Sequence, residues 1–269
     1  MALRSANINI MVRAAEKAGM LLLRDFNEIE KLQISKKSPE AFMQKAREKA
    51  ASILAEELQK TRSEFTILSL PQPHTILNDH EELFIFNPLE GAENFQSGIP
   101  FWCITIAYIK KGKTKAGIIF DPVTNELYWT QFGVGAFLNN TRLYMPNRKV
   151  LKEAHLVMKM PPFPELHQNA YFKQLQYLSQ KCAGFRSFGC PSLELSYVAA
   201  GKFDGYIGAS IDVCSYLVGE LMATESGGHT KTFWPNPETS ETGLLASSEG
   251  FINGLHKVIL TSYASLKND

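Results

Sequence analysis

The sequence predicts an α+β fold, and three observations lead to that class. Two amphipathic helical segments come first, a run of short apolar strands separated by turn residues follows, and strand and helix patterns alternate after about residue 150. With 269 residues, the chain is long enough for one large unit with a sizeable core. We therefore expect a single unit over residues 1–269, with one half over 1–149 and a smaller α/β half over 150–269.

Neither the composition nor the net charge indicates a nucleic-acid or membrane partner. The net charge is +1 and 45% of the residues are hydrophobic, so no overall field favours nucleic acid or an anionic membrane. No run of about 18 apolar residues would span a membrane, and residues 1–19 lack the apolar core of a signal peptide. The four cysteines have no CxxC spacing, and Cys103 and Cys214 lie in apolar surroundings typical of buried thiols. We expect a reduced, cytoplasmic protein.

Both N-terminal helices follow from the spacing of apolar residues. Over residues 5–27 these side chains recur at steps of three or four, which gives one buried stripe: Ile8, Met11, Ala15, Ala18, Leu22 and Phe26. A second helix is predicted over residues 39–61, because Pro39 suits a first helical turn. Its buried face is expected at Phe42, Ala46, Ala50, Ile53, Leu54 and Leu58.

The stretch FIFNPLEGAENFQSGIPF, residues 84–101, is the main candidate for a functional site. Its apolar start predicts a strand that ends at Asn87-Pro88, after which Glu90 and Glu93 bracket Gly91 in a turn. A strand that leads into such a turn can build a metal and phosphate site, because backbone N–H groups around a glycine can face an anion. An ordinary surface turn that contains two glutamates explains the same composition.

The remaining elements alternate along the chain. Two turn segments, residues 111–113 and 122–125, separate strands of a meander. Strands are expected over residues 66–68, 102–110, 115–120, 126–131 and 155–160, and helices over 168–182 and 215–228.

The stretch 84–101 resembles the signature of the inositol monophosphatase family, which reads Asp-Pro-(Ile/Leu)-Asp-Gly-Thr, then Asn-Phe and Gly-x-Pro. The matching residues are Pro88, Leu89, Gly91, Asn94, Phe95, Gly98 and Pro100. A second segment, residues 185–208, is similar to another family pattern at Arg186, Gly189, Leu193, Leu195, Val198, Ala199, Gly201, Asp204 and Gly205. The resemblance implies a layered αβαβα fold, with N-terminal helices on a large antiparallel sheet and a smaller mixed sheet after residue 150.

The resemblance also implies a reaction, the hydrolysis of inositol or sugar phosphate monoesters by bound Mg²⁺. The family's metal-binding carboxylates fall at Leu70 (or Pro71), Asn87, Glu90, Ser215 and Ala46, and only Glu90 is still an acid. A backbone ligand would be the carbonyl of Leu89, and Asp212 is a candidate replacement one helical turn before Ser215. The resemblance also places a phosphate at Gly91 and Ala92, which stand at the Gly-Thr of the signature. No catalytic residue is assigned.

Three hypotheses follow from this altered motif. The first is a catalytically inactive member with no cofactor, acting as an interaction or regulatory protein. The bacterial extragenic-suppressor branch is the nearest resemblance, and it implies a transcription-related protein partner and a homodimer. The second is a weak or altered phosphatase that uses Mg²⁺ with Glu90, Asp212 and Asp79 or Glu81. The third is an anion-binding module built on the turn at Gly91-Ala92.

Overall fold

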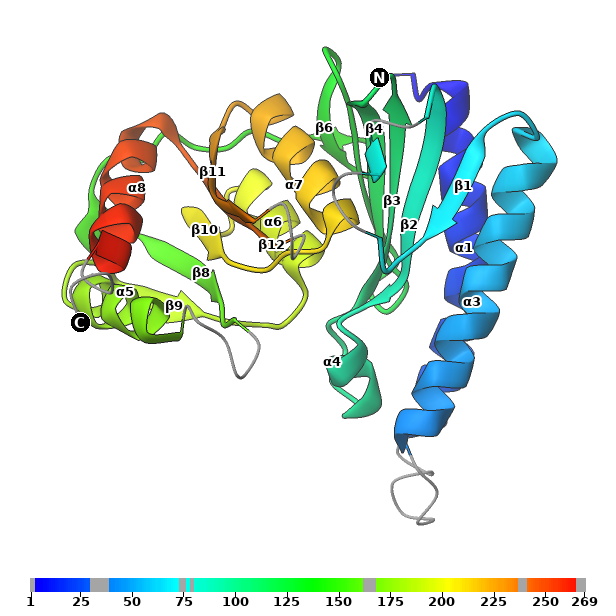
Figure 1. The fold of residues 1–269 in the computed structure, drawn as a ribbon, viewed down its shortest axis with the longest axis horizontal. Coiled ribbons are helices and arrows are strands. Elements are labelled where there is room, and N and C mark those ends of the chain that lie inside the picture. Colours follow the sequence, from blue (N-terminus) through cyan, green and yellow to red (C-terminus); the bar gives the residue numbers. More distant parts are fainter. Residues whose placement is uncertain are drawn as a thin grey trace.

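A computed structural model describes residues 3–29, 39–72, 76–77, 80–161, 168–236 and 241–264. Helices and sheets alternate across the molecule in the order α, β, α, β, α (Figure 1). The outer helices on one side are α1 (Ala6–Phe26) and α3 (Pro39–Thr61), the middle layer holds α6 (Pro191–Ala199) and α7 (Val213–Glu225), and the far side holds α5 (Gln168–Ser179) and α8 (Glu249–Ala264). This arrangement confirms the predicted fold class.

The two N-terminal helices agree with the predicted ranges to within one residue. Helix α1 begins after Ser5, whose hydroxyl accepts a hydrogen bond from the N–H of Ile8 at 3.4 Å. The predicted stripe is buried from Ile8 to Leu22, against the large sheet. Helix α3 begins at Pro39, the first-turn position that suits a residue without an N–H.

The large sheet has seven strands in sequence order. They are β1 (Thr66–Ser69), β2 (Glu82–Glu90), β3 (Cys103–Lys110), β4 (Lys113–Asp121), β5 (Glu126–Gln131), β6 (Gly135–Leu138) and β7 (Thr141–Arg142). The prediction of an antiparallel sheet is wrong for the first pair, which is parallel because a long connection separates β1 from β2, and right for all later neighbours. Lys111 and Gly112, the predicted turn between β3 and β4, both have positive φ.

The predicted end of the signature strand at Asn87-Pro88 is wrong. Strand β2 continues to Glu90, with Asn87 opposite Thr105 and Glu90 opposite Cys103 on β3. The register shifts between the two pairs. Pro88 lies inside that irregularity, where its missing N–H costs no regular ladder bond. As a result, Glu90 stands on a sheet strand rather than in a turn.

The smaller sheet is mixed, as predicted. Its strands are β8 (His155–Lys159), β9 (Gly184–Arg186), β10 (Gly205–Gly208), β11 (His229–Asn236) and β12 (Glu241–Ser247), in the order β11-β12-β10-β8-β9. Strand β8 runs parallel to both β9 and β10, while β12 is antiparallel to its neighbours. Short helices α4 (Ala92–Gln96) and η2 (Leu151–Glu153) complete the described elements.

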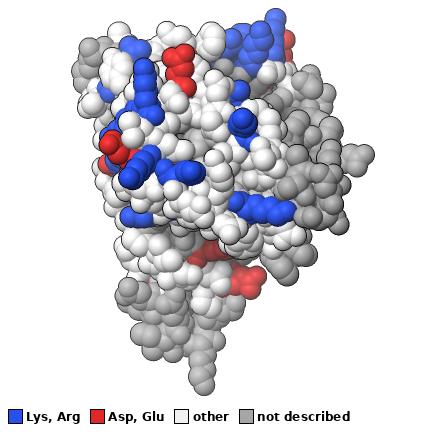
Figure 2. Space-filling model, turned by 90° about the vertical axis from the view of Figure 1, so that its left-hand side faces the viewer, with Lys and Arg blue, Asp and Glu red and all other residues white. Residues whose placement is uncertain are grey.

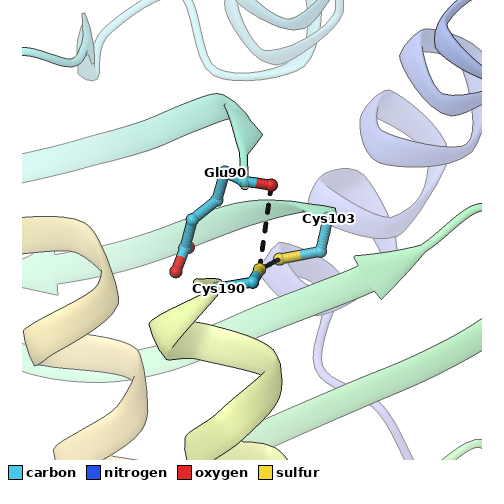
Figure 3. A group of neighbouring side chains, drawn as sticks. All are labelled: Glu90, Cys103 and Cys190. Atoms are coloured by element: carbon cyan, nitrogen blue, oxygen red, sulfur yellow. Dashed lines mark hydrogen bonds between the residues drawn. The ribbon is translucent and has the colours of Figure 1, made fainter. Parts of the chain in front are cut away.

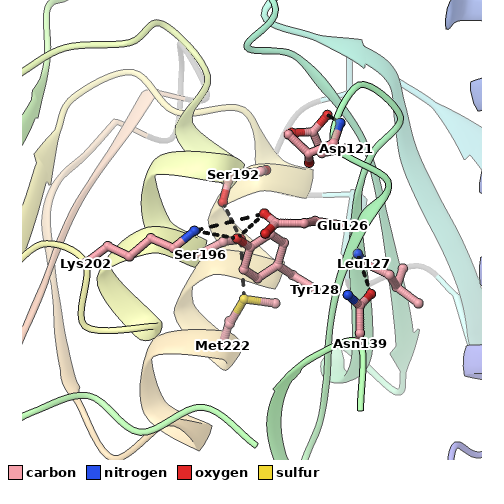
Figure 4. A network of polar contacts seen from close by, with 10 residues as sticks. Asp121, Glu126, Leu127, Tyr128, Asn139, Ser192, Ser196, Lys202 and Met222 are labelled. Carbon is pink, nitrogen blue, oxygen red and sulfur yellow. Dashed lines mark hydrogen bonds and ion pairs between the residues drawn. The ribbon is translucent and has the colours of Figure 1, made fainter. Parts of the chain in front are cut away.

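Helices α6 and α7 are packed between the two sheets and join them. One apolar cluster combines residues of β2 to β6 with residues of both helices. Polar contacts lie beside it (Figure 4): Tyr128 donates to Glu126 at 2.8 Å and accepts from Lys202 at 3.3 Å. Within the helical layer, Ser196 donates to the main-chain oxygen of Ser192 at 2.8 Å.

The surface agrees with the balanced composition. On the face shown in Figure 2, Lys and Arg side chains of the described residues lie in separate groups with neutral surface between them. This face therefore adds no support for nucleic-acid binding. Among the described helices, none is both long enough and apolar enough to cross a membrane.

Candidate functional site

A cleft with a volume of about 770 Å³ lies where the end of β2 meets the second half of the chain. Most of the charged candidate residues identified from the sequence line this cleft. The lining includes Glu90, Gly91, Ala92 and Glu93 from the signature, Lys159, Ser210 and Asp212 from the second half, and Arg47 from α3.

Glu90 is buried at the base of this cleft, with 4% of its surface exposed. One carboxylate oxygen accepts the main-chain N–H of Ser192 at 2.7 Å. The other accepts the hydroxyl of Thr105 at 3.0 Å. Because one donor is on α6 and the other on β3, this carboxylate connects the two halves of the chain.

Burial and a neighbouring charge change the protonation of Glu90. Burial raises the pKa of its carboxyl group from 4.5 to about 7, and the negative charge of Asp212 adds to the increase. The hydrogen bonds from Ser192 oppose it. The carboxyl group therefore changes its charge near neutral pH.

Asp212 is held differently, at the start of α7. It is the N-cap residue, and its carboxylate accepts the N–H of Ser215 at 3.0 Å and the hydroxyl of Ser215 at 2.5 Å. The prediction that Asp212 precedes the helix is confirmed. The helix itself begins at Val213, two residues earlier than predicted, because this cap closes its first turn.

The other predicted metal positions are occupied by residues that serve the fold. Leu70 and Ala46 lie in apolar clusters, 8% and 1% exposed. Asn87 is buried, and its side-chain oxygen accepts the N–H of Leu89 at 3.3 Å. Ser215 is buried beside Asp212. The peptide bond between Leu70 and Pro71 is cis.

Gly91 and Ala92 lie where the strand turns into α4. Gly91 has φ +79°, and a Cβ atom there would stand 2.8 Å from the carbonyl oxygen of Phe101. Only glycine fits that position without strain. Ala92 is the first residue of α4, which has five residues. Both residues line the cleft.

Two basic residues of the cleft were not among the sequence candidates. Lys159, at the end of β8, donates to the main-chain oxygens of Ala209 at 3.1 Å and Ser210 at 2.9 Å. These bonds fix the loop that precedes Asp212. Arg47 follows Ala46 on α3 and lines the same cleft. Neither position carries a sequence pattern that marks it, since contact with the cleft depends on tertiary packing.

Of the remaining acidic candidates, Glu81 does not line the cleft. It forms an exposed ion pair with Lys111, at 3.2 Å between Oε1 and Nζ. Asp79 lies outside the described residues.

Comparisons with known proteins agree with the motifs. The profile of the Inositol monophosphatase family matches residues 4–265. The protein "Inositol-1-monophosphatase" of Rhizobium meliloti is 35% identical over 257 residues, covering 95% of this chain and 97% of that protein. The protein "Nus factor SuhB" of Xylella fastidiosa is 31% identical, covering 95% and 94%. A crystal structure of extragenic suppressor protein suhB from Bartonella henselae is 30% identical, with a TM-score of 0.81 over 95% of this chain and 98% of that one.

Proposed function

The chain belongs to the inositol monophosphatase family, and within it we propose a member without magnesium-dependent phosphatase activity that acts as an interaction or regulatory protein. One observation carries this proposal. Leu70 and Ala46, which stand at two of the positions that the resemblance assigns to metal-binding carboxylates, lie in apolar clusters and offer no side-chain oxygen to Mg²⁺.

The donor set of the cleft fits Mg²⁺ poorly. Mg²⁺ requires hard oxygen ligands in near-octahedral geometry and is usually held through carboxylates. Of the positions that the resemblance assigns to metal ligands, those at Leu70, Ala46 and Ser215 carry an aliphatic side chain or a hydroxyl. Arg47 and Lys159 add positive charge to the same cleft. Their charges repel Mg²⁺ and so disfavour its binding there.

Replacement of the family's clustered carboxylates should also stabilise the fold in the absence of a metal, which fits this proposal. Clustered carboxylates repel one another when no metal is bound. Leu70 and Ala46 instead contribute to apolar packing, and Ser215 donates to Asp212. The resulting fold does not need a metal ion to neutralise its cleft.

Relatives named Nus factor SuhB suggest what kind of partner to seek. Several such proteins match the chain, among them one from Vibrio cholerae that is 32% identical. We extend the proposal to a transcription-related protein partner, to a homodimer, and to the cytoplasm as the compartment. All four cysteines are free thiols, which suits a reducing compartment.

The proposal is tested by titrating the full chain with Mg²⁺ in a calorimeter and measuring phosphate release from inositol monophosphate in the same buffer. We expect no heat of binding and no turnover. The matched control is Glu90→Gln, which keeps the shape of the side chain and removes its charge. Turnover in the wild type that disappears in Glu90→Gln would overturn the proposal.

A weak or altered phosphatase is the second candidate, and one observation favours it. Glu90 and Asp212 line the same cleft, and the charge of Asp212 raises the pKa of Glu90, so the two carboxyl groups are close enough to interact. If they formed a metal site together, Asp212→Asn would abolish turnover as completely as Glu90→Gln. Turnover in the wild type that is lost in both variants would therefore favour this candidate over the first.

A further inference from the structure

Two cysteines that are 87 residues apart in the sequence meet beside Glu90, a residue that lines the cleft (Figure 3). The sulfur atoms of Cys103 and Cys190 are 3.5 Å apart, and both side chains are fully buried. Glu90 lies against them, and one ligand atom from each of the three residues lies within 4.8 Å of the other two. We propose that Cys103, Cys190 and Glu90 form a binding site for a thiophilic divalent metal ion of the zinc class.

With the main-chain oxygen of Glu90 as a fourth donor, two of the distances between donor atoms are close to those of a tetrahedral site. Two thiolates at about 2.3 Å from one zinc ion lie about 3.8 Å from each other, and the observed sulfur–sulfur distance is 3.5 Å. The main-chain oxygen of Glu90 is 3.7 Å from the sulfur of Cys190. A sulfur and an oxygen on the same ion are about 3.5 Å apart. Two edges of the tetrahedron are therefore already in place.

The backbone fixes these positions from both halves of the chain. Glu90 and Cys103 are paired opposite each other at the ends of β2 and β3. Cys190 is the residue before the first turn of α6. A bound ion would thus join the large sheet to the helical layer, at the same point where Ser192 and Thr105 hold the carboxylate.

Those two hydrogen bonds suit a metal ligand. A carboxylate oxygen that accepts one hydrogen bond keeps a lone pair for an ion. Donors that hold the carboxylate in one orientation typically improve metal affinity. From the upper limit of 4.8 Å, the carboxylate must approach the sulfurs by at most about 1 Å to reach a bonding distance.

The chemistry of the donors selects the class of metal. Thiolates are soft ligands that favour zinc-like ions over Mg²⁺. Two thiolates and one carboxylate more than neutralise a divalent charge, which offsets the cost of burying the ion. As the two sulfur–metal bonds form, the two thiol protons pass to the solvent and no electron is transferred. The ion would enter from the cleft, which Glu90 lines.

Cys214 shows what a purely structural buried thiol does in this protein. It is equally buried, and its sulfur donates to the main-chain oxygens of Ile85 at 3.4 Å and Thr105 at 3.5 Å. Its hydrogen bonding is satisfied by the backbone alone. It therefore serves as a matched control for Cys103 and Cys190.

The test uses the full chain, reduced and kept free of oxygen, with Co²⁺ as a spectroscopic probe. We expect one Co²⁺ per chain, with sulfur-to-cobalt charge-transfer absorption and the visible bands of tetrahedral cobalt. Equimolar Zn²⁺ should remove both signals. Cys103→Ser and Cys190→Ser should each weaken Co²⁺ binding at least about 100-fold, more than the loss of a supporting hydrogen bond. Cys214→Ser and Cys182→Ser should bind as the wild type does.

A second measurement keeps the proposal open to refutation if a variant does not fold. In the wild-type chain, alkylation of the buried Cys103 and Cys190, which requires local opening, should be slower with Zn²⁺ than without it, and alkylation of Cys182 should be unchanged, as read by peptide mass mapping. Absence of thiolate–cobalt absorption in the wild type would overturn the proposal, as would absorption that survives both serine variants. None of these readouts involves phosphate release, so they stand or fall separately from the proposed loss of phosphatase activity.

Discussion

Glu90 and Asp212, two acidic residues that line the cleft from the large sheet and from the helical layer, are held by the protein in different ways. Glu90 ends a strand of the large sheet, is 4% exposed, and has a pKa raised to about 7. Asp212 is half-buried at the start of a helix and accepts the hydrogen bonds of an N-cap. An N-cap carboxylate is stabilised by local N–H groups and by the helix dipole, whereas a buried strand carboxylate needs donors from elsewhere in the chain. The carboxylate of Asp212 therefore stabilises the start of α7, whereas the carboxylate of Glu90 links the large sheet to α6.

The largest expected effect is on the pH dependence of stability. Because the folded pKa of Glu90 is raised from 4.5 to about 7, the folded state binds this proton more tightly than the unfolded state. The contribution is complete below the unfolded pKa and is lost as the pH rises through the folded pKa. We expect the free energy of unfolding to fall by about 3 kcal/mol between about pH 4 and pH 8 from this group.

Urea unfolding across this range measures the effect, and Glu90→Gln is its control. The amide does not titrate, so the difference between wild type and variant should contain the whole contribution of Glu90. Parallel pH profiles for the two proteins would show that the carboxyl group is ionised and solvated like an ordinary surface acid.

The next largest effect is the loss of stability when the N-cap residue Asp212 is replaced. Asp212→Ala removes the acceptor for the N–H of Ser215 and should lower the free energy of unfolding by about 1 kcal/mol. Asp212→Ser keeps a capping oxygen and should recover most of the loss. Urea unfolding at about pH 5, where Glu90 is mainly neutral, separates the cap from charge repulsion. Equal losses in both variants would contradict a capping role.

A smaller effect on the pH dependence of stability tests the electrostatic coupling between Asp212 and Glu90. Asp212→Asn keeps a capping oxygen but removes the charge that raises the pKa of Glu90. The fall in stability with rising pH should become shallower and shift to lower pH than in the wild type. An unchanged pH profile would mean that burial alone sets the pKa of Glu90.

The smallest expected effect is that of Mg²⁺ on thermal stability. An ion that binds the folded state raises the melting temperature in proportion to its affinity. Since Leu70, Ala46 and Ser215 stand where the family motif has carboxylates, millimolar Mg²⁺ should change the melting temperature by less than a few degrees. A larger rise that Glu90→Gln abolishes would show that the carboxylate exchanges its protein donors for the metal.

Local residue patterns predict the N-terminal helices and the turns of this protein. The apolar spacing of α1 and α3 and the turn at Lys111-Gly112 depend on neighbouring residues, so the predicted ranges match the structure closely. The strand through Asn87 and Pro88 was missed because the register shift that accommodates the proline is set by pairing with β3, not by local propensity. The positions that the resemblance assigns to metal ligands could be identified only through the family motif.

The environment of each site residue depends on contacts between distant parts of the chain. Ser192 is 102 residues from Glu90, and Cys190 is 87 residues from Cys103, so no local pattern reveals that they touch. The same holds for Arg47 and Lys159, which reach the cleft from opposite halves. The physical reason is that burial and hydrogen bonding, which set the pKa of Glu90 and bring the thiols together, arise only when α6 packs onto the end of the large sheet.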